Sequence, residues 1–274
     1  MPNNKIYDQH IHTCFSDDSQ ADPEEEIKQA IATGLAGICF TDHNDFGYKQ
    51  PDGSDHFTLD FESYLEKLLP LKKKYSDKIK VCVGLEQGLT VPAADLIADF
   101  DPEKKLDFII GSTHVVDGID PYYDIYWEQK SISEGIRHYF ENMYDEVRTI
   151  DNFDVYGHLD YICRYIPDEK IKKDPRDFLP MDLISEILKV IIDKGKGIEL
   201  NTAGLRRGLF ANPCDKILNE YYRLGGEIIT TGSDAHRPEH VGYDLDVAYR
   251  ILAETGFKYI AVFTGRKPEF MPIS

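Results

Sequence analysis

Short apolar runs alternate along this chain with longer segments in which apolar residues recur at every third or fourth position. A brief apolar run is typical of a buried strand, and a helical period is typical of a helix packed on one face. The runs predict strands at residues 5–8, 37–41, 80–85, 106–113, 155–157, 197–200 and 227–231, with a further run at 259–263. Strands that alternate with helices predict parallel β-α units.

The helix signals lie between these runs. Pro23 opens one predicted helix, and Glu24, Glu25 and Glu26 occupy its first turn, where carboxylates suit the helix dipole. Further helices are predicted at 59–75, 133–149, 181–194 and 213–224, with one more before the final run. A polar loop over residues 46–58 is long for a compact domain, and we expect its His56 to be solvent-exposed.

The length agrees with this pattern. The 274 residues are usual for an α/β barrel, which runs to about 250 residues. The chain has no linker, no internal repeat beyond the β-α alternation and no compositionally disordered stretch. We therefore expect a single domain over residues 1–274.

Composition restricts the class of partner. A net charge of −18 opposes binding to nucleic acid and to anionic membranes. No apolar run is long enough to cross a membrane, and no signal peptide precedes the first strand, so a cytoplasmic protein is expected. The five cysteines are scattered without a Cys-x-x-Cys pair, which excludes a zinc knuckle and a disulfide framework.

The candidate chemistry lies where the predicted strands end. Histidines and carboxylates follow one run after another, and His10 and His12 stand two apart, so both side chains point to one face of a strand. The carboxyl ends of parallel barrel strands meet at one mouth, which is where active sites of this fold lie. The candidate metal ligands are His10, His12, Asp17, His43, Glu86, His114, His158, Asp234 and His236.

Nine ligands exceed what one ion takes, since a zinc or manganese ion binds about four to six ligands including water. Glu86 can bridge two ions with its two oxygens. Three dications less the charges of Asp17, Glu86 and Asp234 leave about +3, enough to attract a phosphate to an acidic protein. Asp8, Asp42 and Asp160 are candidates for orienting the imidazoles, or they are turn and capping residues.

The strand-end motifs resemble the polymerase-and-histidinol-phosphatase (PHP) superfamily over nearly the whole chain. The motifs, in order, are Asp8-Gln9-His10-Ile11-His12, Ser16-Asp17, Thr41-Asp42-His43, Gly84-Leu85-Glu86, Ser112-Thr113-His114, Gly157-His158-Leu159-Asp160 and Ser233-Asp234-Ala235-His236. Within the superfamily the chain is most similar to the monofunctional histidinol phosphatases of histidine biosynthesis. The features behind that similarity are the stretch 201–206, Arg164 and the length.

The resemblance implies a distorted (β/α)7 barrel with three divalent ions, which are zinc, iron or manganese. One ion is expected at His10, His12, Glu86 and Asp234, a second at Glu86, His114 and His158, and a third at Asp17, His43 and His236. Glu86, Asp234 and His236 are the expected catalytic residues. Arg164 and one of Arg206 or Arg207 are expected to hold the phosphate, because guanidinium suits bidentate phosphate binding.

The sequence thus predicts a metal-dependent phosphomonoesterase acting on a small phosphate ester, L-histidinol phosphate by resemblance. Three alternatives stay open at this point. They are a phosphatase for another small ester, a metal-binding module without catalysis, and a nuclease-like proofreading domain. The net charge opposes the last of these.

Overall fold

The computed structural model describes residues 5–49, 53–54, 56–101 and 103–273. Seven strands follow one another as parallel neighbours in a single curved sheet. They are β1 (Tyr7–Ile11), β2 (Gly37–Phe40), β4 (Lys80–Gly88), β5 (Phe108–Ser112), β6 (Val155–Tyr156), β7 (Gly197–Asn201) and β8 (Ile229–Gly232). A two-residue strand, β3 (His43–Asn44), pairs with the end of β4. The predicted bounds differ from these by at most three residues.

The sheet nearly closes into a barrel between its first and last strands. Ile11 pairs with Ala235 in parallel, and the amide of His12 donates to the carbonyl of Ala235 at 2.8 Å. The Thr231 hydroxyl also donates to the carbonyl of Tyr7 at 3.0 Å. The architecture is the predicted distorted TIM-like α/β barrel, and the single-domain organisation is confirmed with it.

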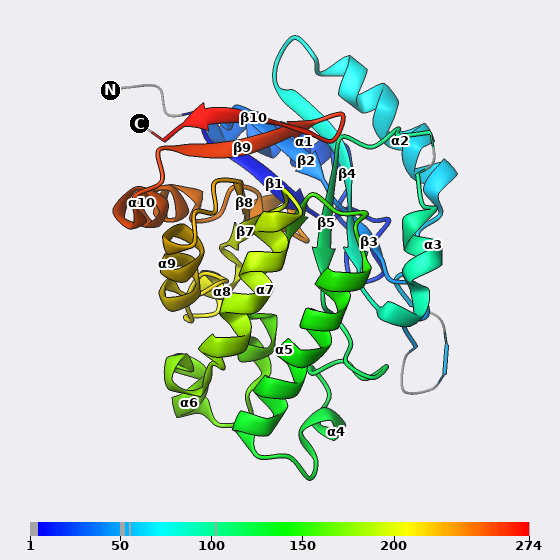
Figure 1. Ribbon diagram of the computed structural model, residues 1–274. Coiled ribbons are helices and arrows are strands. Elements are labelled where there is room, and N and C mark those ends of the chain that lie inside the picture. The colour runs from blue at the N-terminus through cyan, green and yellow to red at the C-terminus, as the bar shows by residue number, and fades with distance from the viewer. Residues whose placement is uncertain (1–4, 50–52, 55, 102, 274) are drawn as a thin grey trace.

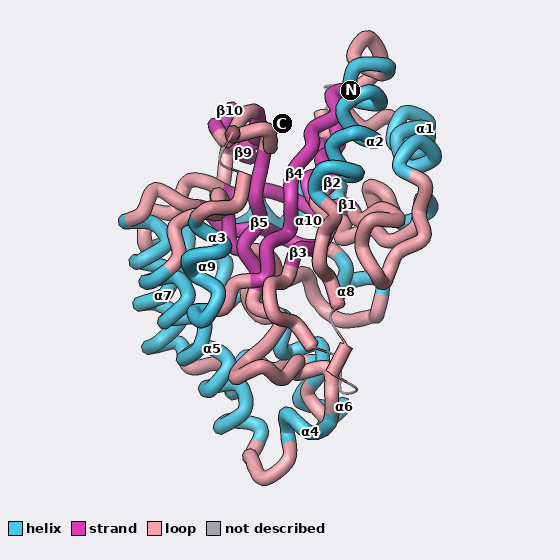
Figure 2. The backbone as a smooth tube through the Cα atoms, turned by 90° about the vertical axis from the view of Figure 1, so that its right-hand side faces the viewer, coloured by secondary structure: helices cyan, strands magenta, loops and turns pink. Residues whose placement is uncertain are grey.

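Helices surround the strands (Figures 1 and 2). Figure 2 shows α5, α7 and α9 on one side of the strands and α1 and α2 on the other. The longer helices are α1 (Pro23–Thr33), α2 (Phe61–Lys74), α5 (Ile132–Thr149), α7 (Met181–Asp193), α9 (Asp215–Arg223) and α10 (Leu245–Thr255). The short helices α3 (Ala94–Ala98), α4 (Asp124–Trp127), α6 (Glu169–Lys173) and α8 (Ala203–Arg206) were not predicted.

Local sequence explains where the helices begin and end. The Asp22 side chain accepts the first free amides of α1, Pro23 follows it, and Gly34 ends the helix with a φ of 78°. Ser131 and Glu134 form a reciprocal capping box at the start of α5. These caps satisfy backbone groups that a helix end leaves unpaired.

The final run does not join the barrel. Strand β9 (Tyr259–Thr264) pairs antiparallel with β10 (Lys267–Pro272), and Figure 1 shows this hairpin across one end of the barrel, opposite α4 and α6. Gln9 reaches it from inside the barrel, donating to the carbonyl of Ala261 at 2.7 Å and accepting from the amide of Phe263 at 3.2 Å. A compact apolar cluster fills this end: Cys39, Cys82, Phe108, Ile110, Val155, Ala261 and Phe263.

Candidate metal centre

The opposite end of the barrel carries the polar side chains. Parallel register places His43 beside Glu86 and Glu86 beside Ile110, so that neighbouring strands deliver their ligand residues to one level. His10 belongs to β1 and Glu86 to β4, and both are fully buried. The other candidate histidines follow their strands by one to four residues or lie in β3. The predicted convergence on one mouth is therefore what the strand geometry produces.

Glu86 lies at the centre of the cluster. Its Oε2 atom is 3.1 Å from His10 Nε2, 3.3 Å from His12 Nε2 and 3.1 Å from His43 Nδ1. None of these contacts has hydrogen-bond geometry, so Glu86 Oε2 and His43 Nδ1 are buried polar atoms without a hydrogen-bond partner. Buried polar atoms are almost always paired, so the arrangement indicates that a cation binds between these two atoms.

The other oxygen of Glu86 faces a different pair of imidazoles. Glu86 Oε1 is 2.8 Å from His158 Nε2 and 3.3 Å from His114 Nε2. It also accepts a hydrogen bond from the Ser112 hydroxyl at 2.7 Å. The two carboxylate oxygens thus point to separate groups of nitrogen donors, as a bridge between two ions requires.

Asp234 and His236 complete the mouth from the segment after β8. Asp234 Oδ1 lies 3.5 Å from His12 Nε2 and 3.9 Å from His10 Nε2. Asp234 has a φ of 55°, and its amide donates to the carbonyl of His10 at 2.9 Å. Residue 232, two positions earlier, is glycine, and a Cβ there would lie only 2.3 Å from the Cβ of His10. A strained backbone held by its neighbours is typical of functional sites.

Among the described residues there are four groups in which the donor atoms lie within 4.8 Å of one another, which is close enough to share an ion. The groups are His12, His43 and His236; His10, His12 and Asp234; His10, Glu86 and His158; and His43, Glu86 and His114. The chemistry of these donors suits zinc or a similar transition metal, which favours imidazole and carboxylate ligands. The site therefore has the composition and the unsatisfied atoms of a metal-binding centre.

The structure does not bring Asp17 into this cluster. The Asp17 Oδ2 atom accepts from the amide of Phe57 at 2.6 Å and lies 2.9 Å from His56 Nδ1. Its neighbour takes the predicted place, because Asp18 Oδ2 is 3.0 Å from His236 Nε2 and 3.8 Å from His43 Nε2. The adjacent residues of the loop turn to opposite sides, so Asp18 faces His43 and His236 and Asp17 faces His56.

The protonation states of His43 and Glu86 suit metal ligands. Burial lowers the pKa of His43 to about 3, with His12 adding to the effect, so the ring is neutral at pH 7. Burial alone would raise the pKa of Glu86, but His10, His43 and His114 hold it well below its usual range. The His43 ring thus already has the protonation state that binds a divalent ion. Nearby carboxylates outweigh burial and raise the pKa of His10 and His114 well above the usual value, so these rings would release a proton on binding an ion.

Each of three imidazoles is oriented by a partner on its far nitrogen. Glu199 Oε1 is 2.7 Å from His10 Nδ1, and Asp45 Oδ2 is 2.6 Å from His114 Nδ1. Such carboxylate partners fix the tautomer and raise the basicity of a ligand histidine. Sequence reasoning missed both. The signal available for Glu199 was a lone carboxylate inside the apolar strand β7.

The third imidazole is oriented through a serine. Ser16 Oγ lies 3.0 Å from His12 Nδ1 and donates to Asp42 Oδ1 at 2.8 Å. Asp42 therefore orients the His12 ring through the Ser16 hydroxyl, which agrees with the first of its two predicted roles.

The other two candidate aspartates have different partners. Asp8 accepts from Ser233 and from the amide of Gly242, and Asp160 accepts from Asn212 and the amide of Cys214. Neither carboxylate bonds an imidazole ring, so both hold loops.

The three predicted arginines line one cavity of about 660 Å³ together with Glu86 and Asp234. Arg164 is buried and its Nη1 lies 3.3 Å from Asp234 Oδ2. Arg206 donates to the carbonyls of Ser233 and Asp234, which fixes the segment that carries Asp234. Arg207 is exposed; its amide donates to the carbonyl of Gly204 at 3.0 Å, and its guanidinium forms no hydrogen bond or ion pair with the described residues.

The rest of this cavity is aromatic with one buried carboxylate. Tyr48, Tyr122 and Tyr161 belong to its lining, as does Asp120, which accepts from the Tyr48 hydroxyl at 2.8 Å. Burial raises the pKa of Asp120. His56 also lines the cavity, with 22% of its side chain exposed, so it is less exposed than the sequence predicted. Arginines and the candidate metal ligands thus share one chamber with an aromatic, acidic wall.

Comparison with known proteins gives a family. The model of the PHP domain family matches residues 8–203. A histidinol-phosphatase of Lactococcus lactis is 33% identical over 272 residues, covering 96% of each chain. A probable histidinol-phosphatase of Thermotoga maritima is 30% identical over 258 residues, covering 94% of this chain and 95% of the relative.

Solved structures agree. The crystal structure of histidinol phosphate phosphatase from Lactococcus lactis, in complex with zinc, L-histidinol and phosphate, superposes with a TM-score of 0.87 at 31% identity. It covers 97% of this chain and 99% of that one. A putative histidinol phosphatase from Listeria monocytogenes shares the fold, with a TM-score of 0.72 at 18% identity and coverage of 88% and 99%. The present chain is a member of the PHP domain family.

Proposed function

We propose that this protein is a metal-dependent histidinol-phosphatase that hydrolyses L-histidinol phosphate to L-histidinol and phosphate. The observation that carries the proposal is the buried Glu86 carboxylate, whose two oxygens face separate groups of histidines beside two arginines. The relatives named histidinol-phosphatase support the choice of substrate, since two of them share at least 30% identity over nearly the full length.

The proposed ligand sets follow the donor groups. His10, His12, Glu86 and Asp234 would hold one divalent ion, and Glu86, His114 and His158 a second. His43 and His236 would hold a third with Asp18, which replaces the predicted Asp17. The distances of Asp18 to these two histidines support this exchange. Three ions of zinc, iron or manganese are proposed, and zinc is the metal in the Lactococcus lactis structure.

The ions and the side chains would have different roles in hydrolysis. Bound divalent ions supply Lewis acidity, which neutralises phosphoryl oxygens and makes water a nucleophile near neutral pH. Glu86 and Asp234 provide the negative charge that holds the ions, and both reach the shared cavity. His236 completes the predicted catalytic set. Burial lowers its pKa, but Asp18 and Asp234 raise it to about 8 overall.

The arginines would bind the phosphate. Arg164 and Arg206 enter the cavity from η2 (Tyr161–Tyr165) and α8, on the side of Asp234. Guanidinium groups offer paired donors to phosphate oxygens and stay charged at any physiological pH. Arg207, whose guanidinium has no partner among the described residues, would add long-range attraction at the rim.

The alcohol half of the substrate would face the aromatic wall. Histidinol carries a cationic amine, for which Asp120 is the carboxylate of the cavity lining that is not among the proposed metal ligands. The loop from Asp45 to Asp55 carries three further carboxylates for such an amine. Asp45 is instead committed to His114 and to the amide of Gly88, and Asp52 and Asp55 lie outside the described residues.

We further propose that residues 1–274 act as one phosphoesterase unit. The family model ends at residue 203, yet Asp234 and His236 belong to the same donor groups as His10 and His12. Across the described residues, no helix is long and apolar enough to span a membrane. The cytoplasmic location and the absence of nucleic-acid partners remain predictions from composition.

Metal analysis together with a substrate panel tests the proposal. Purified protein should contain more than one transition-metal ion per chain, and a chelator should remove both metal and activity. Among histidinol phosphate, a sugar phosphate, a nucleotide, p-nitrophenyl phosphate and a single-stranded oligonucleotide, histidinol phosphate should lead in kcat/KM by at least about tenfold, worth ~1.4 kcal/mol.

The contrary results separate the alternatives. Bound metal without hydrolysis of any ester would indicate a metal-binding module. A flat panel, or a sugar ester in front, would leave a phosphatase for another small ester. Cleavage of the oligonucleotide would indicate a nuclease. Activity that survives complete removal of metal would overturn the metal-dependent mechanism itself.

A further inference from the structure

Arg164 is held on three sides. Its Nε donates to Asn212 Oδ1 at 3.0 Å, its Nη2 to Asn201 Oδ1 at 3.0 Å and its Nη1 to Asp234 Oδ2 at 3.3 Å. A guanidinium has five N–H groups, one on Nε and two on each terminal nitrogen. One N–H on each terminal nitrogen therefore lacks an acceptor among the described residues, which is the pair that a bidentate phosphate contact uses.

The Asn212 side chain can adopt one orientation only. Its Nδ2 donates to Asp160 Oδ1 at 2.6 Å, while Asp160 Oδ2 accepts from the amide of Cys214 at 2.8 Å. An ionised carboxylate accepts and never donates, so the amide nitrogen of Asn212 must face Asp160. The carbonyl oxygen is thereby turned toward Arg164. Both Asn212 and Asp160 are buried, so water does not replace either contact.

The second amide is tied to the first. The backbones of Asn201 and Asn212 exchange two hydrogen bonds, of 2.7 and 2.9 Å. Asn201 Oδ1 accepts from Arg164 and from the amide of Ala203, and its Nδ2 lies 3.2 Å from Glu199 Oε2. Because Glu199 also holds His10, a chain of contacts joins the arginine to the centre of the metal ligands.

We propose that Asn212, oriented by Asp160, is a positioning residue that aims Arg164 at the phosphate of the substrate. The inference rests on the proposed phosphate-binding role of Arg164. Asn212 itself does not line the catalytic cavity. It acts by fixing the Nε edge of the guanidinium, which leaves the terminal N–H groups free for the ligand.

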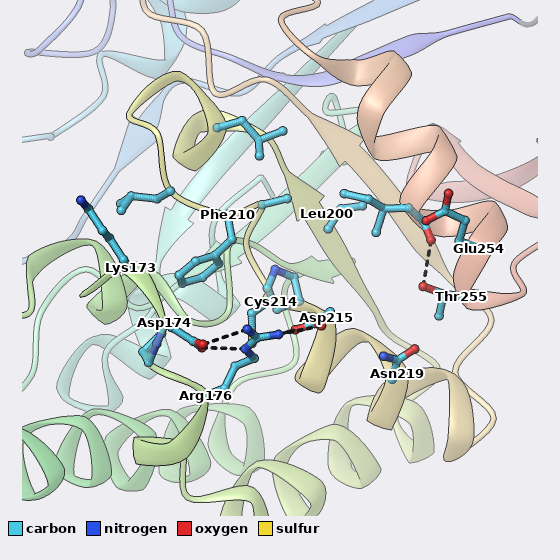
Figure 3. A pocket seen from close by; sticks show the side chains of 16 residues that line it. Lys173, Asp174, Arg176, Leu200, Phe210, Cys214, Asp215, Asn219, Glu254 and Thr255 are labelled. Atoms are coloured by element: carbon cyan, nitrogen blue, oxygen red, sulfur yellow. Dashed lines mark hydrogen bonds and ion pairs between the residues drawn. The ribbon is translucent and has the colours of Figure 1, made fainter. Parts of the chain in front are cut away.

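The surroundings of Asn212 supply a control. Its neighbours Phe210 and Cys214 line a separate side cavity of about 550 Å³ (Figure 3). Asn219, from α9, borders the same cavity, and none of the described residues hydrogen-bonds its side chain. Asn219→Ala is therefore the same chemical change at a nearby position without a link to Arg164, and it should leave activity unchanged.

The first experiment compares Asn212→Ala with and without Arg164. In the wild-type background, Asn212→Ala should raise both the KM for histidinol phosphate and the Ki for inorganic phosphate by about tenfold, equal to ~1.4 kcal/mol. In the Arg164→Ala background, the same change should cost less than about twofold, because neighbours that act through one group are not additive. A merely structural role would cost the same in both backgrounds.

An exchange of the two partners guards against misfolding. Asn212→Asp alone sets two buried carboxylates against each other, and Asp160→Asn alone reverses the amide that faces Arg164. Each single variant should lose about tenfold in kcat/KM, which is ~1.4 kcal/mol. The double variant restores one donor and one acceptor at the same places, so it should recover to within about threefold of the wild type.

The outcomes separate this inference from the function on which it rests. If Arg164→Ala keeps full activity, the proposed role of Arg164 is wrong and the positioning role falls with it. If Arg164→Ala loses activity but Asn212→Ala costs as much on top of it, only the positioning role is overturned. A double variant no better than either single variant would overturn it as well.

Discussion

The two ends of this barrel are built from the same strands and have opposite chemistry. At the amino-terminal end, β9 lies across the opening, and Phe263 packs on Phe108 with ring centroids 4.8 Å apart. At the carboxyl-terminal end, six buried or partly buried histidines surround Glu86 and Asp234. A few residues along one strand, such as β4 from Cys82 to Glu86, separate a dry apolar core from a charged centre.

The difference shows how stability and activity are divided. Apolar contacts at the closed end lower the free energy of the fold without any need for a ligand. The open end concentrates carboxylates and imidazoles, and among them Glu86 Oε2 and His43 Nδ1 are buried without a hydrogen-bond partner, an arrangement that bound cations would stabilise. Substitutions at the open end should therefore affect activity and metal content, and substitutions at the closed end should affect stability.

Glu86→Gln should have the largest effect on activity. The amide keeps the size of the side chain but removes the charge shared by five imidazoles. We expect kcat/KM to fall by at least about 10³-fold, or ~4 kcal/mol, together with loss of at least one bound ion. Glu269→Gln in β10, at the closed end, is the matched control. Equal activity of the two variants would remove Glu86 from the centre of the mechanism.

Phe263→Ala should produce the reverse pattern. Removing a buried ring from the closed end costs about 3 kcal/mol of unfolding free energy, through lost transfer energy and a cavity. Urea denaturation measures this change, and kcat/KM of the folded fraction should stay within about twofold of the wild type. Phe270→Ala, on the exposed side of the same hairpin, is the control. A large loss of kcat/KM in Phe263→Ala would show that the two ends are coupled.

Asp18→Asn compared with Asp17→Asn tests which loop carboxylate serves the third ion. Asp18 faces His43 and His236, so its loss should lower kcat/KM by about 10²-fold, or ~2.7 kcal/mol, with a lower metal content. Asp17 binds His56 and the amide of Phe57, so its loss should cost less than about tenfold. The reverse order would restore the original ligand assignment.

The convergence of the strand-end residues was predictable because two simple rules of strand geometry determine it. Side chains two apart on a strand share a face, and parallel strands end at one mouth. These rules bring His10, Glu86 and His158 together without knowledge of any loop. They do not decide between Asp17 and Asp18, because that choice depends on the backbone of an irregular segment.

The rest was hidden for different physical reasons. Glu199 and Asp45 act on the far nitrogens of histidines, and no local pattern pairs residues 189 positions apart, as His10 and Glu199 are. Strand β10 contains Pro268 and Pro272 and two charged residues, Lys267 and Glu269, which is a poor strand signal. Its pairing follows from β9 and the turn between them.

The smallest predicted effect concerns a carboxyl group that belongs to neither end. Glu26 in α1 is fully buried, and neither oxygen has a hydrogen-bond partner, whereas Glu199 at the mouth is paired. Burial, with Asp42, Asp8 and Asp22 nearby, raises the pKa of Glu26 to about 10.

The folded protein therefore keeps a proton that the unfolded chain releases above about pH 4.5, so stability declines as pH rises between these two values. Glu26→Gln removes this titration and should stabilise the protein more at pH 8 than at pH 5. Urea unfolding at the two pH values measures the difference, with the exposed Glu25→Gln as control. A pH-independent effect of Glu26→Gln would mean that the carboxyl group is ionised in the folded protein. A buried carboxylate without a hydrogen-bond partner would then require a cation beside Glu26 as well.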